Sequence, residues 1–521
     1  MTAAMRTLPP QESDWQGLRA LVLGAGESGL ACAQWLALQG AVVTLVDSRP
    51  MGRPALAETV DFRAGLGLPF SETLLDSQDL LVVSPGLSPH PERASSVSNL
   101  LERARTEGLL VVSELDLFEW ALDRLGCAVP SGASMLAGAD APELALGRPS
   151  VLAVTGTNGK TTTAVLTARL LEATGLDVQL AGNVSPSMLT ALLDRQQSGR
   201  LPQVWVLELS SFQLAWASRF NPTASAILNL SDDHLDWHLD LQDYGQAKLR
   251  ILGLPQSVGR VVLPREEPEL AQQMRVRAAQ PAGQTWSFGL TAPEPSAPGL
   301  GIHREGIDWI VLRRAPEAPL ERLMPAAALR IGGSHNRLNA MAALALALSV
   351  SEDLASMLHA LRHYTGEPHR LSLVGTVGGV DFVDDSKGTN VGATIAALRD
   401  GDAPLAVILG GEGKGQNFRP LAEALRTRGA CAVGIGRDGP VILAEAARQG
   451  VVTLEAGEIT QATSMAFDWV RARLAETGRS QGQVLLSPAC ASFDQFKNYA
   501  HRGEVFVGCV QALATEREGQ P

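Results

Sequence analysis

Residues 151–163 read VLAVTGTNGKTTT, and a helical pattern of alanine, valine and leucine continues from them to residue 171. The apolar run at the start predicts a strand, and the glycines after it predict a tight turn into a helix. Glycine lets backbone N–H groups approach an anion closely, and a helix N-terminus adds partial positive charge. Lys160 would reach the terminal phosphates of a nucleotide, and the Thr161 hydroxyl would bind Mg²⁺. The stretch therefore predicts a loop that binds a nucleoside triphosphate.

One position departs from the usual phosphate-loop pattern. The glycine expected five residues before Gly159 is Val154, and a glycine comes at Gly156 instead. The alternative is an ordinary strand–turn–helix without a ligand. That alternative does not require Gly-Lys-Thr at the junction, so we favour the phosphate loop.

Length and composition limit the classes of protein to which this chain can belong. A chain of 521 residues, 45% hydrophobic and 19% charged, is typical of a globular enzyme with about three domains. The net charge of −12 and the lack of a convincing basic patch argue against a nucleic-acid partner. The five cysteines are scattered without metal-ligand spacing, which indicates reduced thiols and a cytoplasmic location. With no long apolar run, we expect neither a signal peptide nor membrane insertion.

The first 125 residues carry the start of a Rossmann-type unit. A strand over 19–23 leads into a glycine-rich turn, a helical pattern and a second strand over 41–46 that ends at Asp47. This order favours binding of a dinucleotide or nucleotide sugar, although a doubly wound domain without a ligand remains the alternative. A further strand over 80–83 ends at Ser84, where parallel sheets place ligands.

The central part of the chain continues this pattern. A strand over 204–207 ends in Glu208, the expected place for a Mg²⁺ ligand beside a phosphate loop. A strand over 226–230 leads to acidic residues around His234, and Lys248 follows on a helix-like stretch. His234 could instead be structural, and Lys248 could be an ordinary surface lysine.

Asn336 and Asn339 share one helix face farther along, which suits a purine edge as well as helix capping. After residue 366, strands over 405–409, 432–435 and 484–486 each run into a polar loop. The predicted fold class is α/β with three domains: N-terminal Rossmann-like (1–125), central P-loop ATPase-like with a parallel sheet (126–365), and C-terminal Rossmann-like (366–521). We expect insertions near 126–150 and 280–330, the latter as peripheral hairpins or loops.

Several stretches together resemble the Mur ligase family. They are residues 156–162, 208–211, 335–336 with Asn339, 369–370, and 385–387. Within that family, residues 233–236, 386–390 and 486–494 are similar to the members that add D-glutamate. The resemblance covers nearly the whole chain. Gly388, Glu367 and Tyr499 depart from the residues usual at their positions, which bears on fine substrate contacts.

The resemblance implies an ATP-dependent ligase that adds D-glutamate to UDP-N-acetylmuramoyl-L-alanine through an acyl phosphate, with two Mg²⁺ ions. It implies a monomer in cytoplasmic peptidoglycan synthesis, and hence in cell shape and division. The catalytic residues would be Lys160, Glu208, His234 and Lys248. ATP would contact Gly156, Thr157, Asn158, Gly159, Lys160, Thr161, Thr162, Asn336, Arg370 and Asp385. Metal would be held by Thr161, Glu208, His234 and a carbamylated Lys248. The UDP substrate would contact Ser28, Asp47, Ser48, Ser84 and Asn183. D-Glutamate would contact Lys387, Thr389, Ser492, Phe493 and Tyr499.

Two other classes of protein stay open. One is a ligase that adds another amino acid or makes folylpolyglutamate, which residues 486–494 argue against. The other is a non-catalytic nucleotide-binding regulator, for which the polar groups in strand-end loops are too many. Since Lys387 and Arg370 belong to the third domain, we expect that domain to close over the second during the reaction.

Overall fold

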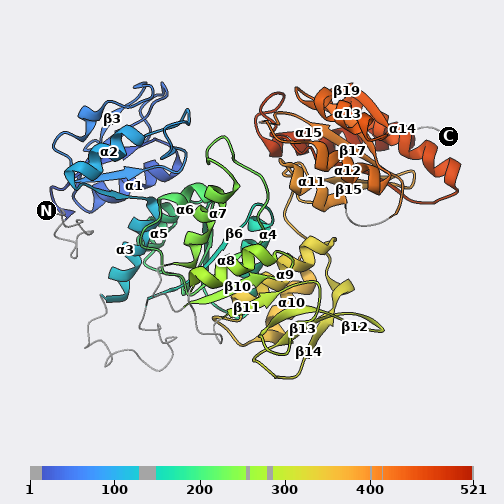
Figure 1. The fold of residues 1–521 in the computed structure, drawn as a ribbon, viewed down its shortest axis with the longest axis horizontal. Coiled ribbons are helices and arrows are strands. Elements are labelled where there is room, and N and C mark those ends of the chain that lie inside the picture. The colour runs from blue at the N-terminus through green and yellow to red at the C-terminus, as the bar shows by residue number, and fades with distance from the viewer. Residues whose placement is uncertain are drawn as a thin grey trace. The chain divides into compact units, whose positions relative to one another are not determined.

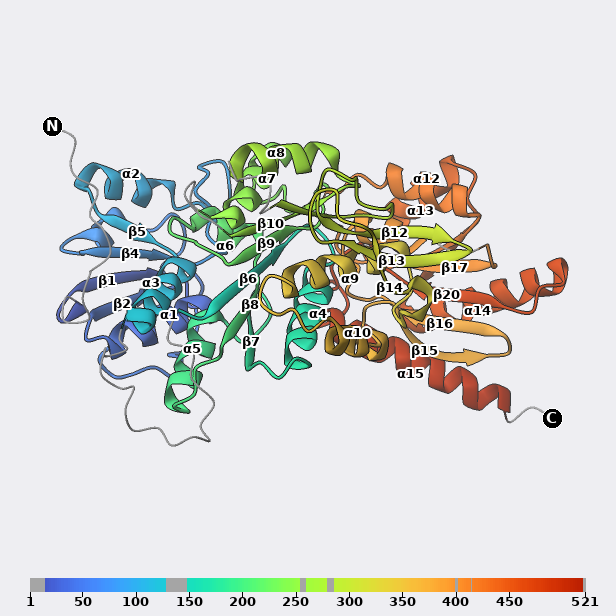
Figure 2. The ribbon, with the colours of Figure 1, turned by 90° about the horizontal axis from the view of Figure 1, so that it is seen from below.

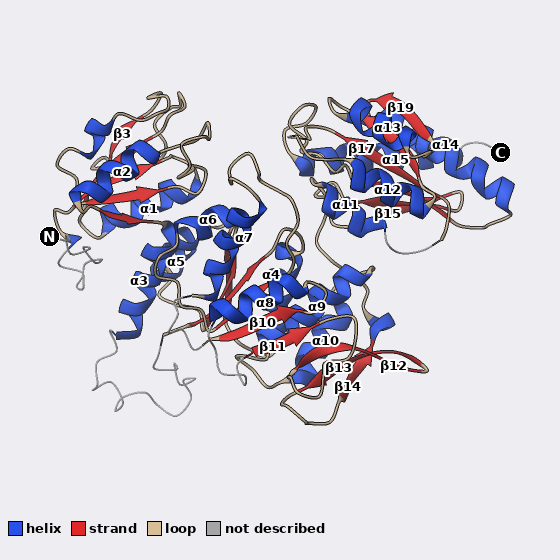
Figure 3. Ribbon diagram, viewed as in Figure 1, coloured by secondary structure: helices blue, strands red, loops and turns tan. Residues whose placement is uncertain are grey.

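The computed structural model describes residues 15–127, 148–253, 259–278, 285–398, 402–413 and 415–518. Figure 3 shows that both helices and strands occur along these residues. The chain divides into two compact units. The first takes its described residues from 15–230, 234–326 and 339–361, and the second takes them from 231–233, 327–338 and 362–518. Most of the expected insertion near 126–150 lies outside the described residues.

The first sheet of unit 1 has five parallel strands in the order β3-β2-β1-β4-β5 (Figure 1). Its strands are β1 (Arg19–Leu23), β2 (Val42–Val46), β3 (Asp61–Arg63), β4 (Leu80–Val83) and β5 (Leu110–Val112). Its helices are α1 (Glu27–Leu38), α2 (Ser98–Glu107) and α3 (Glu114–Cys127). The strand order reverses between β1 and β4, so the crevice at their carboxyl ends is where such a sheet places a ligand.

The second sheet of unit 1 has nine strands in the order β14-β13-β12-β11-β10-β9-β6-β8-β7 (Figure 2). Its parallel part comprises β6 (Ser150–Thr155), β7 (Val178–Gly182), β8 (Val204–Glu208), β9 (Ala224–Ile227), β10 (Arg260–Pro264) and β11 (Thr285–Phe288). The accompanying helices are α4 (Lys160–Glu172), α5 (Met188–Gln197), α6 (Ser211–Trp216), α7 (Leu241–Leu249), α8 (Pro268–Ala278), α9 (Ser334–Ala347) and α10 (Leu354–His363). The phosphate-loop candidate thus lies between β6 and α4, and β6 has parallel neighbours on both sides, β9 and β8.

The described part of the region 280–330, which begins at residue 285, extends this sheet instead of covering it. Here β12 (Gly299–Glu305) pairs in parallel with β11, and β13 (Ile307–Arg313) and β14 (Glu321–Pro325) follow as antiparallel strands. The expectation of hairpins is confirmed for this described part, and the hairpins form the edge of the nine-stranded sheet.

The predicted strand over 226–230 is wrong at its carboxyl end, because β9 ends at Ile227. The reason is local. The backbone oxygen of Asn229 accepts a hydrogen bond from the Thr157 N–H at 3.1 Å, so this residue serves the phosphate loop and has left the sheet ladder.

The sheet of unit 2 has six strands in the order β15-β16-β20-β17-β18-β19, with β15 antiparallel to β16 and the rest parallel. The strands are β15 (Ser372–Val377), β16 (Val380–Asp384), β17 (Leu405–Gly410), β18 (Cys431–Ile435), β19 (Thr453–Gly457) and β20 (Gly482–Leu486). One apolar core joins a face of the sheet to α14 (Ile459–Thr477) and α15 (Tyr499–Glu518). A second core joins the other face to α11 (Val391–Leu398), α12 (Arg419–Arg428) and α13 (Gly439–Arg448).

The α/β class with three mainly parallel sheets is confirmed. The domain boundaries near residues 125 and 365 stay predictions. Among the described residues, no helix combines the length and the apolar character needed to cross a membrane.

Candidate active site

The phosphate-loop candidate has the glycine requirement that its sequence predicts. Gly159 precedes α4 with a φ of 83°, a left-handed conformation that favours glycine. A Cβ atom on Gly159 would lie 2.4 Å from Oδ1 of Asn339, so the α9 side chain comes directly against the loop. The loop conformation and the close approach of Asn339 therefore both depend on glycine here.

Asn229 is a member of this site that the sequence reasoning missed. Its Oδ1 accepts the Asn158 N–H at 2.9 Å, and its Nδ2 donates to the Asn158 oxygen at 3.1 Å. This pair of bonds holds the loop between β6 and α4. An asparagine just after an apolar strand was the available signal, but the prediction had placed it inside the strand.

Two lysine side chains reach the phosphate loop from different helices. Nζ of Lys160 donates to the backbone oxygens of Gly156 and Thr157, both at 2.8 Å. Nζ of Lys248, on α7, donates to the Gly156 oxygen at 2.9 Å. The surface-lysine alternative for Lys248 is wrong, because this side chain is only 1% exposed.

Glu208 ends β8 next to β6 and is 2% exposed. Its Oε1 accepts a 2.8 Å hydrogen bond from Nδ2 of Asn183, which follows β7. Its Oε2 is buried and has no hydrogen-bond partner among the described residues. An acceptor buried without a donor is costly, and Mg²⁺ prefers carboxylate oxygens. The donor set at this strand end therefore fits a divalent cation.

His234 lies in the loop before α7 with a φ of 55°. Its ring centroid is 4.7 Å from that of Phe212 and 6.2 Å from that of Tyr244. The Tyr244 hydroxyl in turn donates to Oγ1 of Thr157 at 3.3 Å. The Tyr244 side chain thus lies between His234 and the phosphate loop. The role of His234 in metal binding stays a prediction.

The predicted UDP-substrate residues of the first sheet gather at the carboxyl ends of β1, β2 and β4. Ser84 donates from Oγ to the Gly24 oxygen at 3.0 Å, and Ser28 is hydrogen-bonded to Glu114. Ser48, directly after Asp47, accepts the Gly67 N–H through its backbone oxygen. These serines surround the glycine-rich turn, as the Rossmann pattern requires.

Asp47 is held by the protein itself. It is 2% exposed, and its oxygens accept the Ala25 N–H at 2.7 Å and the Arg49 N–H at 2.8 Å. Burial raises the pKa of Asp47, but the hydrogen bonds from Arg49 and Ala25 outweigh it and bring the pKa to about 2. The carboxylate therefore stays ionised and supports the glycine turn, while contact with a ribose stays a prediction.

In unit 2, Asp385 follows β16, and its Oδ2 accepts a 2.7 Å hydrogen bond from Oγ of Ser487. Burial raises the pKa of Asp385 to about 7, although the Ser487 bond and the nearby Arg370 charge oppose the shift. Asn336, also predicted to bind nucleotide, donates from Nδ2 to the Gly332 oxygen at 2.7 Å. This bond satisfies a carbonyl before α9, so Asn336 has at least a local structural role.

The predicted D-glutamate residues lie on loops of unit 2. Nζ of Lys387 lies 3.8 Å from the ring centroid of Tyr499, at the start of α15. Ser492 is 2% exposed and Phe493 is 67% exposed, and both follow β20. Thr389 is partly buried in the loop before α11. The structure brings Lys387 and Tyr499 together, and the remaining contacts with D-glutamate stay predictions.

Arg502 is a second residue that the sequence reasoning missed. This fully buried guanidinium donates to the backbone oxygens of Ser386 at 2.9 Å and Cys490 at 3.0 Å. Burial lowers the pKa of Arg502 to about 10, so the group remains charged near neutral pH. It joins the two loops that carry Lys387 and Ser492. Nothing in the local sequence marked Arg502, because His501 and Glu504 give the start of α15 a mixed polar and apolar pattern.

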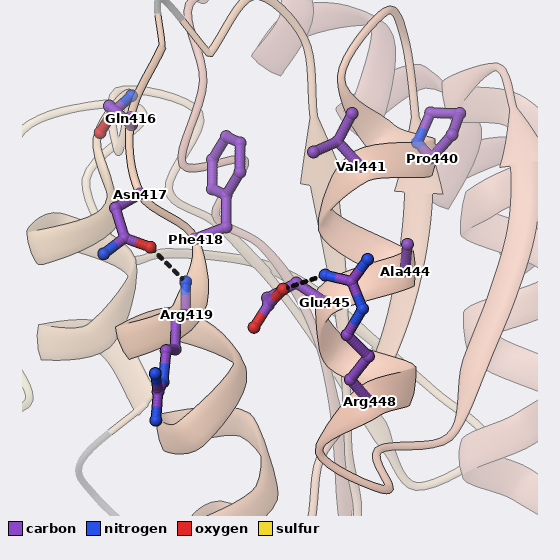
Figure 4. A pocket seen from close by; sticks show the side chains of 9 residues that line it. All are labelled: Gln416, Asn417, Phe418, Arg419, Pro440, Val441, Ala444, Glu445 and Arg448. Atoms are coloured by element: carbon purple, nitrogen blue, oxygen red, sulfur yellow. Dashed lines mark hydrogen bonds and ion pairs between the residues drawn. The ribbon is translucent and has the colours of Figure 1, made fainter.

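A cavity of about 610 Å³ lies elsewhere in unit 2, between α12 and α13 (Figure 4). Phe418 and Val441 line it together with the ion pair of Glu445 and Arg448. None of the residues predicted from the sequence lines this cavity, so we do not include it in the candidate site.

The fold and these loops define a three-domain α/β protein with a phosphate loop and a buried carboxylate beside it. Comparison with known families matches residues 154–347 to the Mur ligase middle domain and residues 18–104 to the Mur ligase MurD-like N-terminal domain. The chain belongs to the Mur ligase family.

Similar proteins extend this match over almost the whole chain. The chain is 43% identical to the UDP-N-acetylmuramoylalanine–D-glutamate ligase of Bordetella parapertussis, with 95% of this chain and 96% of the relative covered. It is 44% identical to the protein of the same name from Ralstonia nicotianae, with 95% and 97% covered. Among solved structures, MurF from Acinetobacter baumannii has a similar fold, with a TM-score of 0.54, 15% identity, and 96% and 92% covered.

Proposed function

We propose that this chain is an ATP-dependent ligase that joins D-glutamate to UDP-N-acetylmuramoyl-L-alanine in the synthesis of peptidoglycan precursors. The observation that carries the proposal is the buried Oε2 of Glu208, which has no hydrogen-bond partner among the residues that the structure describes and lies one strand away from the phosphate loop. A phosphoryl-transfer site needs such a carboxylate for its metal ion. The similarity to the D-glutamate ligases, which extends from end to end, supports the choice of substrates.

The reaction must overcome the poor reactivity of a carboxylate toward an amine. The substrate carboxylate attacks the γ-phosphoryl group of ATP, which forms an acyl phosphate and releases ADP. The amine of D-glutamate then attacks the acyl carbon, and phosphate leaves as the amide forms. Two products, ADP and phosphate, therefore accompany each amide bond.

The residues around the phosphate loop would stabilise this transfer. Backbone N–H groups of residues 156–162 would bind the phosphates, and Lys160 would neutralise charge on them. Mg²⁺ would polarise the phosphoryl oxygens. It would be held by Thr161, Glu208, His234 and a carbamylated Lys248. We include two ions in this proposal because the resemblance to the Mur ligase family implies them.

The other residues would bind and orient the substrates. We assign the UDP part to residues 1–125 through Ser28, Asp47, Ser48 and Ser84, with Asn183 nearer the reacting carboxylate. We assign ATP to the central domain (126–365), where Asn336 would help to hold the nucleotide, together with Arg370 and Asp385 of the third domain. We assign D-glutamate to residues 366–521, through Lys387, Thr389, Ser492, Phe493 and Tyr499. We also propose that the protein is a cytoplasmic monomer and that it binds no nucleic acid. Closure of the third domain over the second stays a prediction.

The experiment is to incubate the purified chain with ATP, Mg²⁺ and UDP-N-acetylmuramoyl-L-alanine and a panel of amino acids. Mass spectrometry should find one product, heavier than the nucleotide substrate by one glutamyl residue, with one phosphate released per product. A parallel incubation with a reduced folate and L-glutamate tests the other ligase class. Product formation only in the folate incubation would replace our proposal, and none in either would favour a non-catalytic role.

A further inference from the structure

The loop after β4, residues 87–93, contacts the segment that runs from His234 into α7. Ser88 donates from Oγ to the Trp237 oxygen at 3.2 Å, and Arg93 donates from Nη2 to the Leu239 oxygen at 3.2 Å. His90 packs edge-on against the Trp237 ring, with centroids 6.0 Å apart. The first sheet of unit 1 thereby holds the loop that precedes the buried Lys248.

One set of these contacts continues farther, as a chain of side-chain hydrogen bonds. Nε2 of His90 lies 2.9 Å from Oδ2 of Asp243, and Nδ1 of His238 lies 2.9 Å from the same oxygen. On the other side of its ring, Nε2 of His238 lies 3.0 Å from Oγ of Ser211. Four side chains from three separate segments are therefore linked in series.

The direction of these hydrogen bonds follows from charge. His238 is fully buried, and burial disfavours the charged form of an imidazole. A neutral imidazole carries one N–H, and the carboxylate of Asp243 can only accept. His238 therefore donates from Nδ1 to Asp243 and accepts the Ser211 hydroxyl at Nε2. His90 donates to Asp243 from the other side.

Ser211 is the first residue of α6, which lies beside α7 (Figures 1 and 2). It comes three residues after Glu208. Between them, Leu209 is held to β6, because its N–H donates to the Val154 oxygen at 2.9 Å and its oxygen accepts the Thr155 hydroxyl at 2.6 Å. The Ser211 bond to His238 holds the other end of this turn, together with the capping hydrogen bonds between Ser210 and Gln213.

We propose that His90 is a positioning residue for the metal-binding turn at Glu208, acting through the series Asp243, His238 and Ser211. The inference rests on the proposed function for the identity of the reaction, but the geometry requires only that Glu208 hold a divalent cation. His90 lies in the loop after β4 of the first sheet, and that sheet also carries the predicted UDP-substrate loops. Through the series, His90 thus sets the geometry at Glu208, beside the phosphate loop of the second sheet.

The same atoms invite a second interpretation. The ligand atoms of His90, His238 and Asp243 lie within 4.8 Å of one another, as they would around a transition-metal ion. We favour the hydrogen-bonded series because Oδ2 of Asp243 accepts from both imidazoles, and the Ser211 hydroxyl bonds to the other ring nitrogen of His238. The test below separates the two.

The first test compares His90→Ala and His90→Gln with Trp216→Phe. Trp216 donates from Nε1 to the Leu87 oxygen at 3.1 Å. Trp216→Phe therefore removes a hydrogen bond between α6 and the loop 87–93 that is not part of the series. Loss of a residue that orients a metal ligand typically weakens metal affinity or activity about 10–100-fold. We expect His90→Ala to raise the Mn²⁺ dissociation constant, measured by electron paramagnetic resonance with ADP present, by about tenfold. The Mg²⁺ concentration for half-maximal activity should rise in parallel, while the KM for D-glutamate stays unchanged.

The Gln side chain carries an N–H donor at a reach similar to the imidazole, so His90→Gln should recover most of the affinity. Trp216→Phe should bind Mn²⁺ like the wild type, and thermal unfolding confirms that each variant is folded. Unchanged Mn²⁺ affinity in a folded His90→Ala variant would overturn the proposal, as would equal weakening in Trp216→Phe. The Mn²⁺ titration needs no turnover, so it remains decisive even if D-glutamate proves not to be the substrate.

The second test is a double-mutant cycle between the two ends of the series, His90→Ala and Ser211→Ala. Effects of mutations within one hydrogen-bond network are non-additive, whereas those of independent sites add. We expect the double variant to bind Mn²⁺ no more weakly than the weaker single variant. Additive losses would overturn the series. One equivalent of Zn²⁺ found in the wild-type protein and lost in His90→Ala would replace it with a metal site.

Discussion

Nδ2 of Asn183 donates a 2.8 Å hydrogen bond to Oε1 of Glu208, and Oε2 is buried with no partner among the described residues. Glu208 ends β8 and Asn183 directly follows the neighbouring strand β7, and the Asn183 N–H also donates to the Glu208 backbone oxygen at 2.7 Å. One carboxylate oxygen is thus fixed by the protein, and the other is available to a cation. The proposed mechanism depends on this division.

Glu208→Gln tests it directly, because the amide keeps the shape and removes the charge. We expect turnover to fall at least about a hundredfold, the usual cost of deleting one preorganised electrostatic contact. Phosphate release measures turnover, and thermal unfolding checks the fold. Wild-type turnover in a folded Glu208→Gln protein would remove Glu208 from the site.

Lys248 gives a second prediction. Its side chain is 1% exposed, and a cationic ammonium facing Mg²⁺ is disfavoured, so metal proximity and desolvation favour the neutral amine, which can add carbon dioxide. The resulting carbamate supplies two oxygens on a long arm. Lys248→Ala should be nearly inactive and partly restored by acetate, whereas Lys248→Arg should stay inactive, because guanidinium cannot lose its proton. Activity assays, with ¹³C-labelled bicarbonate to detect the carbamate by NMR, check this. Full activity of Lys248→Arg would rule the carbamate out.

Asp385 predicts a pH dependence of stability. Burial raises its pKa from 3.8 to about 7 in the folded protein, so between these values the folded state binds a proton that the unfolded state has lost. The contribution of Asp385 to the free energy of unfolding therefore falls as pH rises from about 4 to about 7. Asp385→Asn removes this titration and keeps an oxygen for the Ser487 hydroxyl. The difference in unfolding free energy, variant minus wild type, should grow across this window by up to roughly 4 kcal/mol. Urea unfolding at each pH measures it, and a difference independent of pH would contradict the assignment.

Arg502 yields a prediction about the D-glutamate loops. A lysine ammonium cannot reproduce the planar guanidinium, whose Nη2 donates to the Ser386 and Cys490 oxygens while its Nη1 donates to the Gly410 oxygen at 3.5 Å. Arg502→Lys should lower the free energy of unfolding by roughly 2 kcal/mol, because a buried carbonyl loses its donor. The KM for D-glutamate should also rise, with Mn²⁺–ADP binding unchanged. The control is Arg473→Lys at an exposed position of α14, where an ion pair with Glu476 contributes little. Equal effects of the two variants would contradict the role of Arg502.

The parallel strands that carry the candidate site could be predicted from the sequence. Each is a short apolar run followed by glycine or a polar residue, and the predicted strands 19–23 and 80–83 match β1 and β4 to the residue. Because the carboxyl ends of such strands meet at one edge of a sheet, the positions of Glu208 and Asp385 followed from the pattern alone.

The missed features depend on contacts between distant segments. Asn229 reads as part of a strand until the phosphate loop, 71 residues earlier, is seen to use its side chain. Arg502 binds an oxygen 116 residues away, and His90 meets Asp243 across 153 residues. No local periodicity encodes such pairs. The antiparallel strands of the second sheet were also hard to predict, since β12 and β13 are exposed at one end and follow a stretch rich in proline.

The central claim is that this chain activates a carboxylate for attack by D-glutamate. The most direct measurement compares phosphate release with D-glutamate and with L-glutamate, at saturating ATP, Mg²⁺ and UDP-N-acetylmuramoyl-L-alanine. A dicarboxylate could be contacted at several points by Lys387, Thr389 and Ser492. Contacts at several points distinguish the two configurations at its α-carbon. We predict rapid release that requires D-glutamate, with L-glutamate a poor substrate. Equal rates with the two enantiomers, or release that needs no amino acid, would contradict the account.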